Sequence, residues 1–142
     1  MLEENKEVCY WATEVIGAPN DTVDVCTDIE SDNPEWYPET VKLAEFLIIL
    51  MYYQCAQGGY EWGSAVYESN FNSVEEYNQF LLAIIVDYQK VVENNGLVIY
   101  QKGSKLIWHF TDEEGNLADT IFASTRTEED MADLEEYGFY PL

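Results

Sequence analysis

The sequence predicts one α+β domain over residues 1–142, with three longer helices, a three-stranded antiparallel meander near the C-terminus and a short final helix. Two patterns indicate this order. Apolar residues recur at helical spacing through the first two thirds of the chain, and from Leu97 they alternate with a period of two. The chain is also 47% hydrophobic and 15% aromatic, which is enough apolar material to build a core.

The first helix is expected over residues 3–16. Its apolar residues follow the i, i+3, i+4, i+7 spacing of one buried stripe, namely Val8, Trp11, Ala12 and Val15. A glycine and a proline in the run 17–20 end it. Residues 21–29 alternate in part, which fits either a short edge strand or an ordered loop. The acid- and proline-rich run 30–38 is expected to be an exposed loop.

The second helix is expected from Pro38 to Gln57, because proline suits a first helical turn. Its middle, residues 46–53, is apolar on every face, which is typical of a central helix covered on all sides. Residues 60–72 are expected to form an aromatic loop. The run 73–76 reads as a capping box, and the third helix is expected to continue from there to Glu93.

Residues 97–101 and 106–111 flank a short turn and predict a β-hairpin. A second turn at 112–116 and a third strand at 117–123 complete the expected meander. Thr127 is placed to cap the short final helix, which is expected to end at Gly138. The apolar tail 139–142 is expected to pack against the core.

Charge is the most unusual feature of the composition. The chain carries 28 Asp and Glu against 6 Lys and Arg, a formal net charge of −22. So few cations cannot neutralise a row of phosphates, so we expect no direct binding to nucleic acid and none to an anionic membrane. Like charges around a compact core repel one another and lower the stability of the folded protein. That the chain keeps so many carboxylates therefore favours a function in binding a basic protein.

The cysteines and the N-terminus predict a cytoplasmic location. Cys9, Cys26 and Cys55 make an odd number without a C-x-x-C pair, which is typical of buried thiols in a reducing compartment. The N-terminus has neither the basic nor the apolar region of a secretory leader. The longest apolar run is also too short to span a membrane.

Catalytic and metal-binding motifs are not recognisable. His109 is the only histidine, and no Cys–His or Ser–His–Asp arrangement can be assembled around it. The carboxylates between Asp28 and Glu39 echo a calcium loop, but Asn33 stands where that loop needs glycine, and prolines interrupt it. We therefore expect no enzyme activity, no cofactor and no resident metal.

A partner-binding surface is predicted in two segments of high carboxylate density. The acidic loop contributes Asp28, Glu30, Asp32 and Glu35, with Trp36 and Tyr37 as aromatic anchors. The final helix contributes Glu128, Glu129, Asp130, Asp133, Glu135 and Glu136. Carboxylates three and four residues apart on a helix lie close together and repel one another, so this row is not neutralised within the helix. A dense row of negative charges of this kind can stand in for part of a phosphate backbone.

In size, charge and lack of a catalytic motif, the chain resembles the small acidic proteins that block nucleases and other nucleic-acid-binding enzymes. These include phage anti-defence proteins, such as DNA mimics and CRISPR inhibitors, and immunity proteins against bacterial toxins. The resemblance implies steric and electrostatic occlusion of a cationic groove. The first hypothesis is therefore an inhibitor of a basic nuclease or other nucleic-acid-binding effector. An immunity protein is the alternative, and an acidic enzyme or small-ligand binder is a third possibility.

We predict that added sodium chloride stabilises the protein. Screening relieves repulsion among the surface carboxylates, since the Debye length falls from about 10 Å at 0.1 M to about 3 Å at 1 M. The melting temperature should rise between low and moderate sodium chloride, a salt chosen because sulfate strengthens apolar burial by itself. A flat or falling melting temperature would mean that the carboxylates are already compensated.

Overall fold

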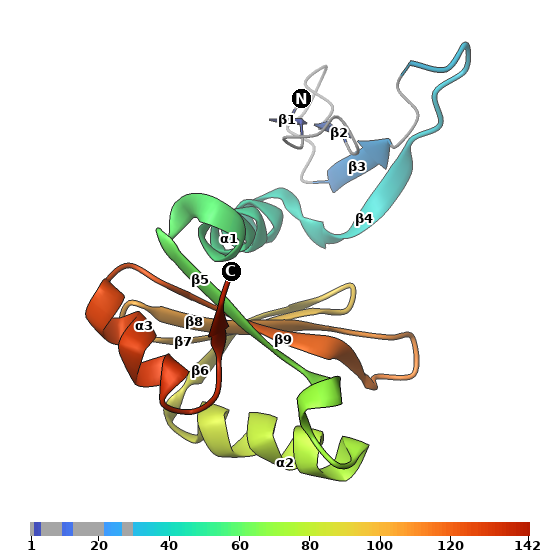
Figure 1. The fold of residues 1–142 in the computed structure, drawn as a ribbon. Coiled ribbons are helices and arrows are strands. Elements are labelled where there is room, and N and C mark those ends of the chain that lie inside the picture. Colours follow the sequence, from blue (N-terminus) through green and yellow to red (C-terminus); the bar gives the residue numbers. More distant parts are fainter. Residues whose placement is uncertain (1, 4–9, 13–21, 27–29) are drawn as a thin grey trace. The chain divides into compact units, whose positions relative to one another are not determined.

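The computed structural model describes residues 2–3, 10–12, 22–26 and 30–142, and the chain divides into two compact units. The N-terminal unit is Met1–Leu50 and the C-terminal unit is Met51–Leu142. Figure 1 shows a sheet in each. The expectation of a single folding domain remains a prediction, and each unit is described here by itself.

The N-terminal unit contains a four-stranded antiparallel sheet in the order β1-β2-β3-β4. The strands are β1 (Leu2–Glu3), β2 (Tyr10–Ala12), β3 (Thr22–Cys26) and β4 (Tyr37–Lys42). Val23 and Cys26 are its buried apolar side chains, at 1% and 0% exposure. The Trp11 indole donates a 3.1 Å hydrogen bond to the Glu39 carboxylate and packs against the Phe46 ring.

The first predicted helix is wrong where the structure describes it. Leu2–Glu3 and Tyr10–Ala12 are strands, whereas Val8 and Val15 lie outside the described residues. A short apolar run satisfies helical spacing and strand alternation alike, and pairing with β3 decides between them. Of the two alternatives for residues 21–29, Thr22–Cys26 adopts the strand, but β3 pairs with both β2 and β4 and is therefore not the expected edge strand.

Helix α1 (Leu43–Gln54) begins later than predicted, because Tyr37–Lys42 pairs with β3 as strand β4. Pro38 is tolerated there since β4 is an edge strand. The expectation that this helix is covered on all sides is also wrong. Phe46 is its buried residue, while Leu47, Ile48 and Met51 are each about half exposed.

The C-terminal unit is built on a six-stranded antiparallel sheet in the order β10-β5-β9-β8-β7-β6. The helices α2 (Val74–Ile84) and α3 (Glu128–Glu135) accompany it. The strands are β5 (Trp62–Tyr67), β6 (Gln89–Asn94), β7 (Leu97–Lys102), β8 (Lys105–Thr111), β9 (Leu117–Thr125) and β10 (Tyr140–Pro141).

The predicted fold class is therefore wrong: the protein is mostly β, with two sheets, and its C-terminal sheet is not a three-stranded meander. The predicted loop 60–72 contains β5, whose small residues Ser64 and Ala65 are fully buried. The third helix does not reach Glu93. It ends at Ile84, a 3₁₀ turn follows over Ile85–Asp87, and β6 pairs with β7.

One face of this sheet packs against α2 and α3 and forms the hydrophobic core. The fully or nearly buried members of this core are Val66, Tyr77, Leu81, Ile107, Ile121, Ala123, Leu134 and Phe139. The predicted caps at Ser73 and Thr127 are confirmed, because Ser73 Oγ accepts from the Glu76 N–H and Thr127 Oγ1 accepts from the Asp130 N–H. The capping box predicted over 73–76 is only half formed, because the Glu76 carboxylate accepts from the Asn72 N–H instead of the Ser73 N–H. The predicted packing of the tail is confirmed only at Phe139, which is 2% exposed, whereas Tyr140 and Leu142 are 56% and 76% exposed.

The opposite face of the sheet is organised around Trp108. Its ring stacks on Phe122 at a centroid distance of 4.3 Å, and its indole N–H donates to Ser124 Oγ. Ser124 in turn donates to the carbonyl of Ala56, in the π-helical turn Cys55–Gly59 that follows α1. In the described part of the chain, every helix is too short or too polar to cross a lipid bilayer.

The tight β6–β7 turn requires glycine at position 96. Gly96 has φ +81°, and a Cβ there would lie 2.7 Å from the Thr111 carbonyl oxygen. Gly103, in the β7–β8 turn, has φ +59° with open space around it. Gly103→Ala should cost roughly 1–2 kcal/mol of unfolding free energy from the left-handed backbone alone.

Gly96→Ala should be clearly more destabilising than Gly103→Ala, because the steric clash adds to the same backbone strain. Denaturant unfolding of the two variants measures the difference. Equal losses would show that Thr111 moves away without cost, contrary to this expectation.

Candidate functional site: an acidic helix beside a tyrosine- and lysine-lined pocket

Helix α3 presents a carboxylate-rich face to solvent. Met131 and Leu134 are its buried side chains, at 2% and 3% exposure, and they anchor the helix to the sheet. Their spacing of three puts most of the acidic residues on the outer face. Glu128, Glu129, Asp133, Glu135 and Glu136 are exposed, and Asp130 is half buried.

Two of the six carboxylates of the final helix, the half-buried Asp130 and the exposed Asp133, pair with Lys105 of β8. The Lys105 ammonium lies 2.7 Å from the Asp133 carboxylate and 3.5 Å from that of Asp130. Burial favours a lower pKa for Lys105, but the hydrogen bond and charge of Asp133, with the charge of Asp130, raise it overall. The Ser104 hydroxyl, which donates to Asp130, is the main cause that lowers the pKa of that carboxyl.

The remaining four carboxylates have no internal partner. Among the sixteen Asp and Glu of residues 51–142, seven make no hydrogen bond or ion pair through their carboxylates. Four of the seven lie on α3 or at its end: Glu128, Glu129, Glu135 and Glu136. The other three, Glu61, Glu68 and Glu113, are scattered over different elements.

The C-terminal end of α3 is electrostatically unfavourable. Glu128 and Glu129 lie in the first turn, where the positive end of the helix dipole stabilises carboxylates. Glu135 and Glu136 lie at the other end, and no basic residue is present in the last turn. Each carboxylate at that end opposes the dipole by a few tenths of a kcal/mol to about 1 kcal/mol, so the helix stability alone does not account for them.

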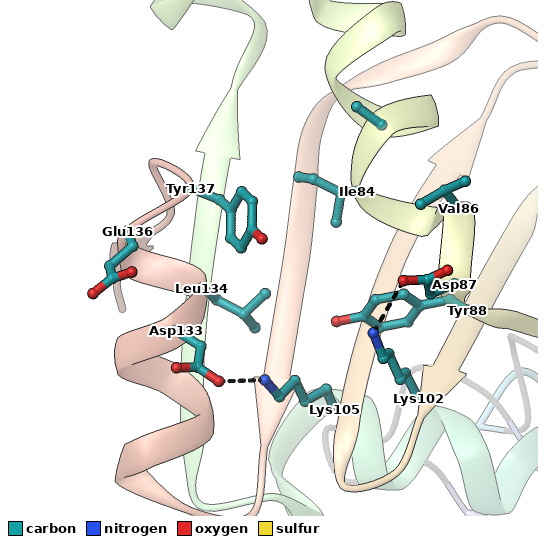
Figure 2. Close-up of a pocket in the computed structure, with 11 residues that line it drawn as sticks. Ile84, Val86, Asp87, Tyr88, Lys102, Lys105, Asp133, Leu134, Glu136 and Tyr137 are labelled. Atoms are coloured by element: carbon teal, nitrogen blue, oxygen red, sulfur yellow. Dashed lines mark hydrogen bonds and ion pairs between the residues drawn. The ribbon is translucent and has the colours of Figure 1, made fainter.

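A pocket of about 410 Å³ opens beside α3, and Figure 2 shows its walls. They come from the end of α2 with the following 3₁₀ turn, from the β7–β8 hairpin and from α3. Tyr88 and Tyr137 are the aromatic members and Ile84, Val86 and Leu134 the apolar ones. Burial is the main cause that raises the pKa of Tyr88, which therefore stays neutral at physiological pH.

The cations of the C-terminal unit are all engaged within it. On one side of the pocket, Lys102 lies 3.4 Å from Asp87 and 5.9 Å from the centroid of the Tyr88 ring. Lys90 pairs with Glu93 at 2.6 Å, and the Arg126 guanidinium lies 5.0 Å from the centroid of the Tyr60 ring. With Lys105 also paired, this unit presents no basic patch.

The acidic loop predicted as the second binding segment belongs to the N-terminal unit. Glu30, Asp32, Glu35 and Trp36 are exposed in a turn and an extended stretch, and Tyr37 is the first residue of β4. The Tyr37 hydroxyl donates to the Glu35 carboxylate. Asp28 lies outside the described residues. In the described part of the chain, no three side chains of metal-binding type come together.

Sequence reasoning missed the members of the site that α3 does not supply. The run 102–105 was read as a hairpin turn, although it holds two of the chain's six cations. Lysines placed in an otherwise acidic chain are a signal of internal counter-ions. The partner of Lys105 could not be inferred, because Asp133 is 28 residues away in sequence.

Comparisons of the chain with protein-family models, with curated proteins and with solved structures gave no match.

Removing the charge of Lys105 should destabilise the protein. Lys105→Met leaves the partly buried Asp130 and the exposed Asp133, at 22% and 60% side-chain exposure, without their shared cation. We expect the unfolding free energy to fall by about 1–3 kcal/mol, which lies between the values typical of surface and of buried ion pairs.

Lys90→Met is the matched control, because the Lys90–Glu93 pair is exposed and should contribute less than about 0.5 kcal/mol. Urea unfolding midpoints at equal m-value compare the two variants. Similar midpoints for both would contradict a structural role for Lys105.

Proposed function

We propose that the protein is an acidic inhibitor that binds the basic, nucleic-acid-binding surface of a partner protein and blocks it by steric and electrostatic occlusion. The partner is a nuclease or another nucleic-acid-binding effector, as for phage anti-defence proteins of the DNA-mimic or anti-CRISPR type. The carrying observation is that four carboxylates without an internal partner are gathered on α3 and its C-terminal end.

The spacing of these charges supports the proposal. Glu128 to Glu136 covers roughly 12 Å of helix axis at 1.5 Å per residue. Six carboxylates less the charge of Lys105 leave five net negative charges over this length. That is about one per 2–3 Å, between the roughly 1.7 Å per charge of duplex DNA and the 3.4 Å of one strand.

The pocket beside α3 supports a complex that dissociates slowly as well as one that forms quickly. Complementary charge mainly speeds association, whereas buried anchors slow dissociation. Tyr137 and Val86 line the pocket and are 67% and 77% exposed, so both are available to a partner. A basic side chain of the partner can lie there against the Tyr137 ring.

An immunity protein that neutralises a bacterial toxin is the second candidate. The exposed pair Trp36 and Tyr37 beside Glu35 favours it, because aromatic anchors among carboxylates suit a basic protein surface whatever that surface binds. In either case we propose action in the cytoplasm, without catalysis, cofactor or direct nucleic-acid binding.

Charge reversal on α3 tests the proposal. Glu128→Lys with Glu135→Lys changes two carboxylates on one helix face that have no internal partner. We expect the affinity for the partner to fall at least tenfold, or about 1.4 kcal/mol. Glu61→Lys with Glu113→Lys is the control, since it makes the same charge change at two exposed sites elsewhere and should alter affinity less than about threefold.

A parallel variant, Glu30→Lys with Asp32→Lys, tests the acidic loop. The partner is first captured from a nuclease-treated host lysate, and its affinity for each variant is measured by calorimetry. Competition with a labelled duplex then distinguishes the candidates: a nucleic-acid effector releases the duplex, whereas a toxin with another target does not. If both charge-reversed variants fold and bind as tightly as the parent, the proposed surfaces are wrong.

A further inference from the structure

The pocket beside α3 offers exposed aromatic and aliphatic surface together with two ion pairs. Figure 2 shows Tyr137 and Leu134 on one side of it and Val86 and Tyr88 on the other. Tyr137 and Val86 are 67% and 77% exposed, so a partner can reach both. The volume of about 410 Å³ lies near the lower end of the roughly 300–1,000 Å³ range of small-ligand sites, which suits one large side chain.

Tyr137 is held in place and is available for a stacking contact. The N–H groups of Tyr137 and Phe139 donate to the Leu134 carbonyl at 3.0 and 3.3 Å, and the side chains of Leu134 and Phe139 are buried. Within the described residues, the Tyr137 ring contacts no other ring and no cation, and its hydroxyl makes no hydrogen bond. Tyrosine on a fixed turn loses little conformational entropy when it binds, which makes it a favoured anchor at interfaces.

The charges that line the pocket cancel in pairs, with one exception. Lys105 pairs with Asp133 at 2.7 Å, and Lys102 pairs with Asp87 at 3.4 Å. The exception is Glu136, whose carboxylate points away from the other lining residues in Figure 2. A group inside the pocket therefore meets little net charge, which suits a neutral ring better than an ion.

The pocket and the unpartnered carboxylates lie close together on one helix. Leu134 and Tyr137 line the pocket, and Glu135 and Glu136 lie between them in sequence. One helical turn rises about 5.4 Å, so a ring bound in the pocket has negative charges within roughly one turn of it. A partner that uses both features must present a neutral ring flanked by basic groups.

Grooves that bind single-stranded nucleic acid have this composition. Their basic residues follow the phosphate backbone, and their aromatic side chains stack on successive bases. Surfaces that bind a duplex contact phosphates and the edges of base pairs in the grooves, because the faces of the bases are stacked inside the helix. A neutral pocket beside a row of negative charges thus matches a single strand better than a duplex.

We propose that the partner is a protein whose groove binds single-stranded nucleic acid, and that the pocket beside α3 takes the aromatic side chain on which that groove stacks a base. The ring lies against Tyr137 and Val86 in place of a base. The lysines or arginines beside it meet the four carboxylates of α3 that have no internal partner, in place of phosphates. This inference rests on the proposed function and names the class of its partner.

Two basic pentapeptides test the pocket without the natural partner. Acetyl-KKWKK-amide carries one aromatic ring among lysines, and acetyl-KKAKK-amide has the same charge without the ring. Each is titrated into ¹⁵N-labelled protein at low ionic strength, where surface attraction is least screened. We expect the tryptophan peptide to bind at least about fivefold more tightly and to shift the backbone signals of residues 84–88 and 133–138.

Three variants locate the contact. Tyr137→Ala should lower the affinity for the tryptophan peptide to that for the alanine peptide. Tyr140→Ala is the matched control, because Tyr140 is an exposed tyrosine on β10 that does not line the pocket. Glu128→Lys with Glu135→Lys should weaken both peptides alike, since it acts on charge alone.

The outcomes separate the pocket from the proposed function. If the parent binds both peptides equally, or if Tyr137→Ala and Tyr140→Ala have equal effects, the pocket assignment is overturned while occlusion by charge still stands. If the charge-reversed variant binds both peptides as tightly as the parent does, the proposed function loses its surface on α3 instead.

The captured partner tests the class of nucleic acid. We expect it to bind a labelled oligothymidylate of about 15 nucleotides, and the parent protein to displace that strand. Tyr137→Ala should need at least about fivefold more protein than Tyr140→Ala for the same displacement. A partner that binds only duplex, or equal displacement by the two variants, would overturn the single-strand assignment and leave the broader inhibitor proposal standing.

Discussion

Burial of strand β8 on both faces is the constraint on which the C-terminal unit depends. Leu106, Ile107, Trp108 and His109 are consecutive, and none is more than 6% exposed. One face packs under α2 and α3, and the other carries the Trp108–Phe122 stack. Hydrogen bonding to β7 and β9 pairs the backbone on both sides. This continuous apolar strand supplies the cohesion that a unit with sixteen carboxylates and four cations needs against its own repulsion.

Two polar residues of the inward face of this strand line different cavities. Lys105 begins β8 and pairs with the carboxylates of α3, whereas His109 lies four residues later and lines a cavity beside α2. Four residues of strand separate them by roughly 13 Å. Helix α2 covers the interval, because its residues from Val74 to Leu82 line the His109 cavity and Ile84 lines the pocket beside α3. The buried core between them includes Leu81 and Ile107.

Local signals in the sequence identified some elements well and long-range pairing decided the rest. The β7–β8 hairpin, the turn at 112–116 and the caps at Ser73 and Thr127 each depend on a few neighbouring residues, and the structure contains them. Strand β5 was missed because its glycine, serine and alanine resemble a loop, although pairing with β9 and β10 buries its middle. Strand β6 was missed because apolar spacing continues in helical register past Ile84. The exposed carboxylates of α3 were predictable from charge density, but the pairing of Asp133 with Lys105 depends on the packing of α3 near β8.

Helix α3 differs from the other acidic segments of the C-terminal unit in how many of its carboxylates have a structural role. In the turn before β9, the Asp112 carboxylate accepts hydrogen bonds from the Asn116 side-chain amide and from the backbone N–H groups of Asn116 and Glu114. The bond from the Asn116 side chain is the main cause that lowers the pKa of Asp112, and the backbone bonds add to it. Glu76 accepts from the Asn72 N–H just before α2, and Asp87 holds Lys102. Such residues are explained by the fold itself. Glu135 and Glu136 oppose the dipole of their own helix and have no internal partner. Because the fold does not use this charge, and because it lowers the stability of the helix that carries it, we propose that it binds an external cationic partner.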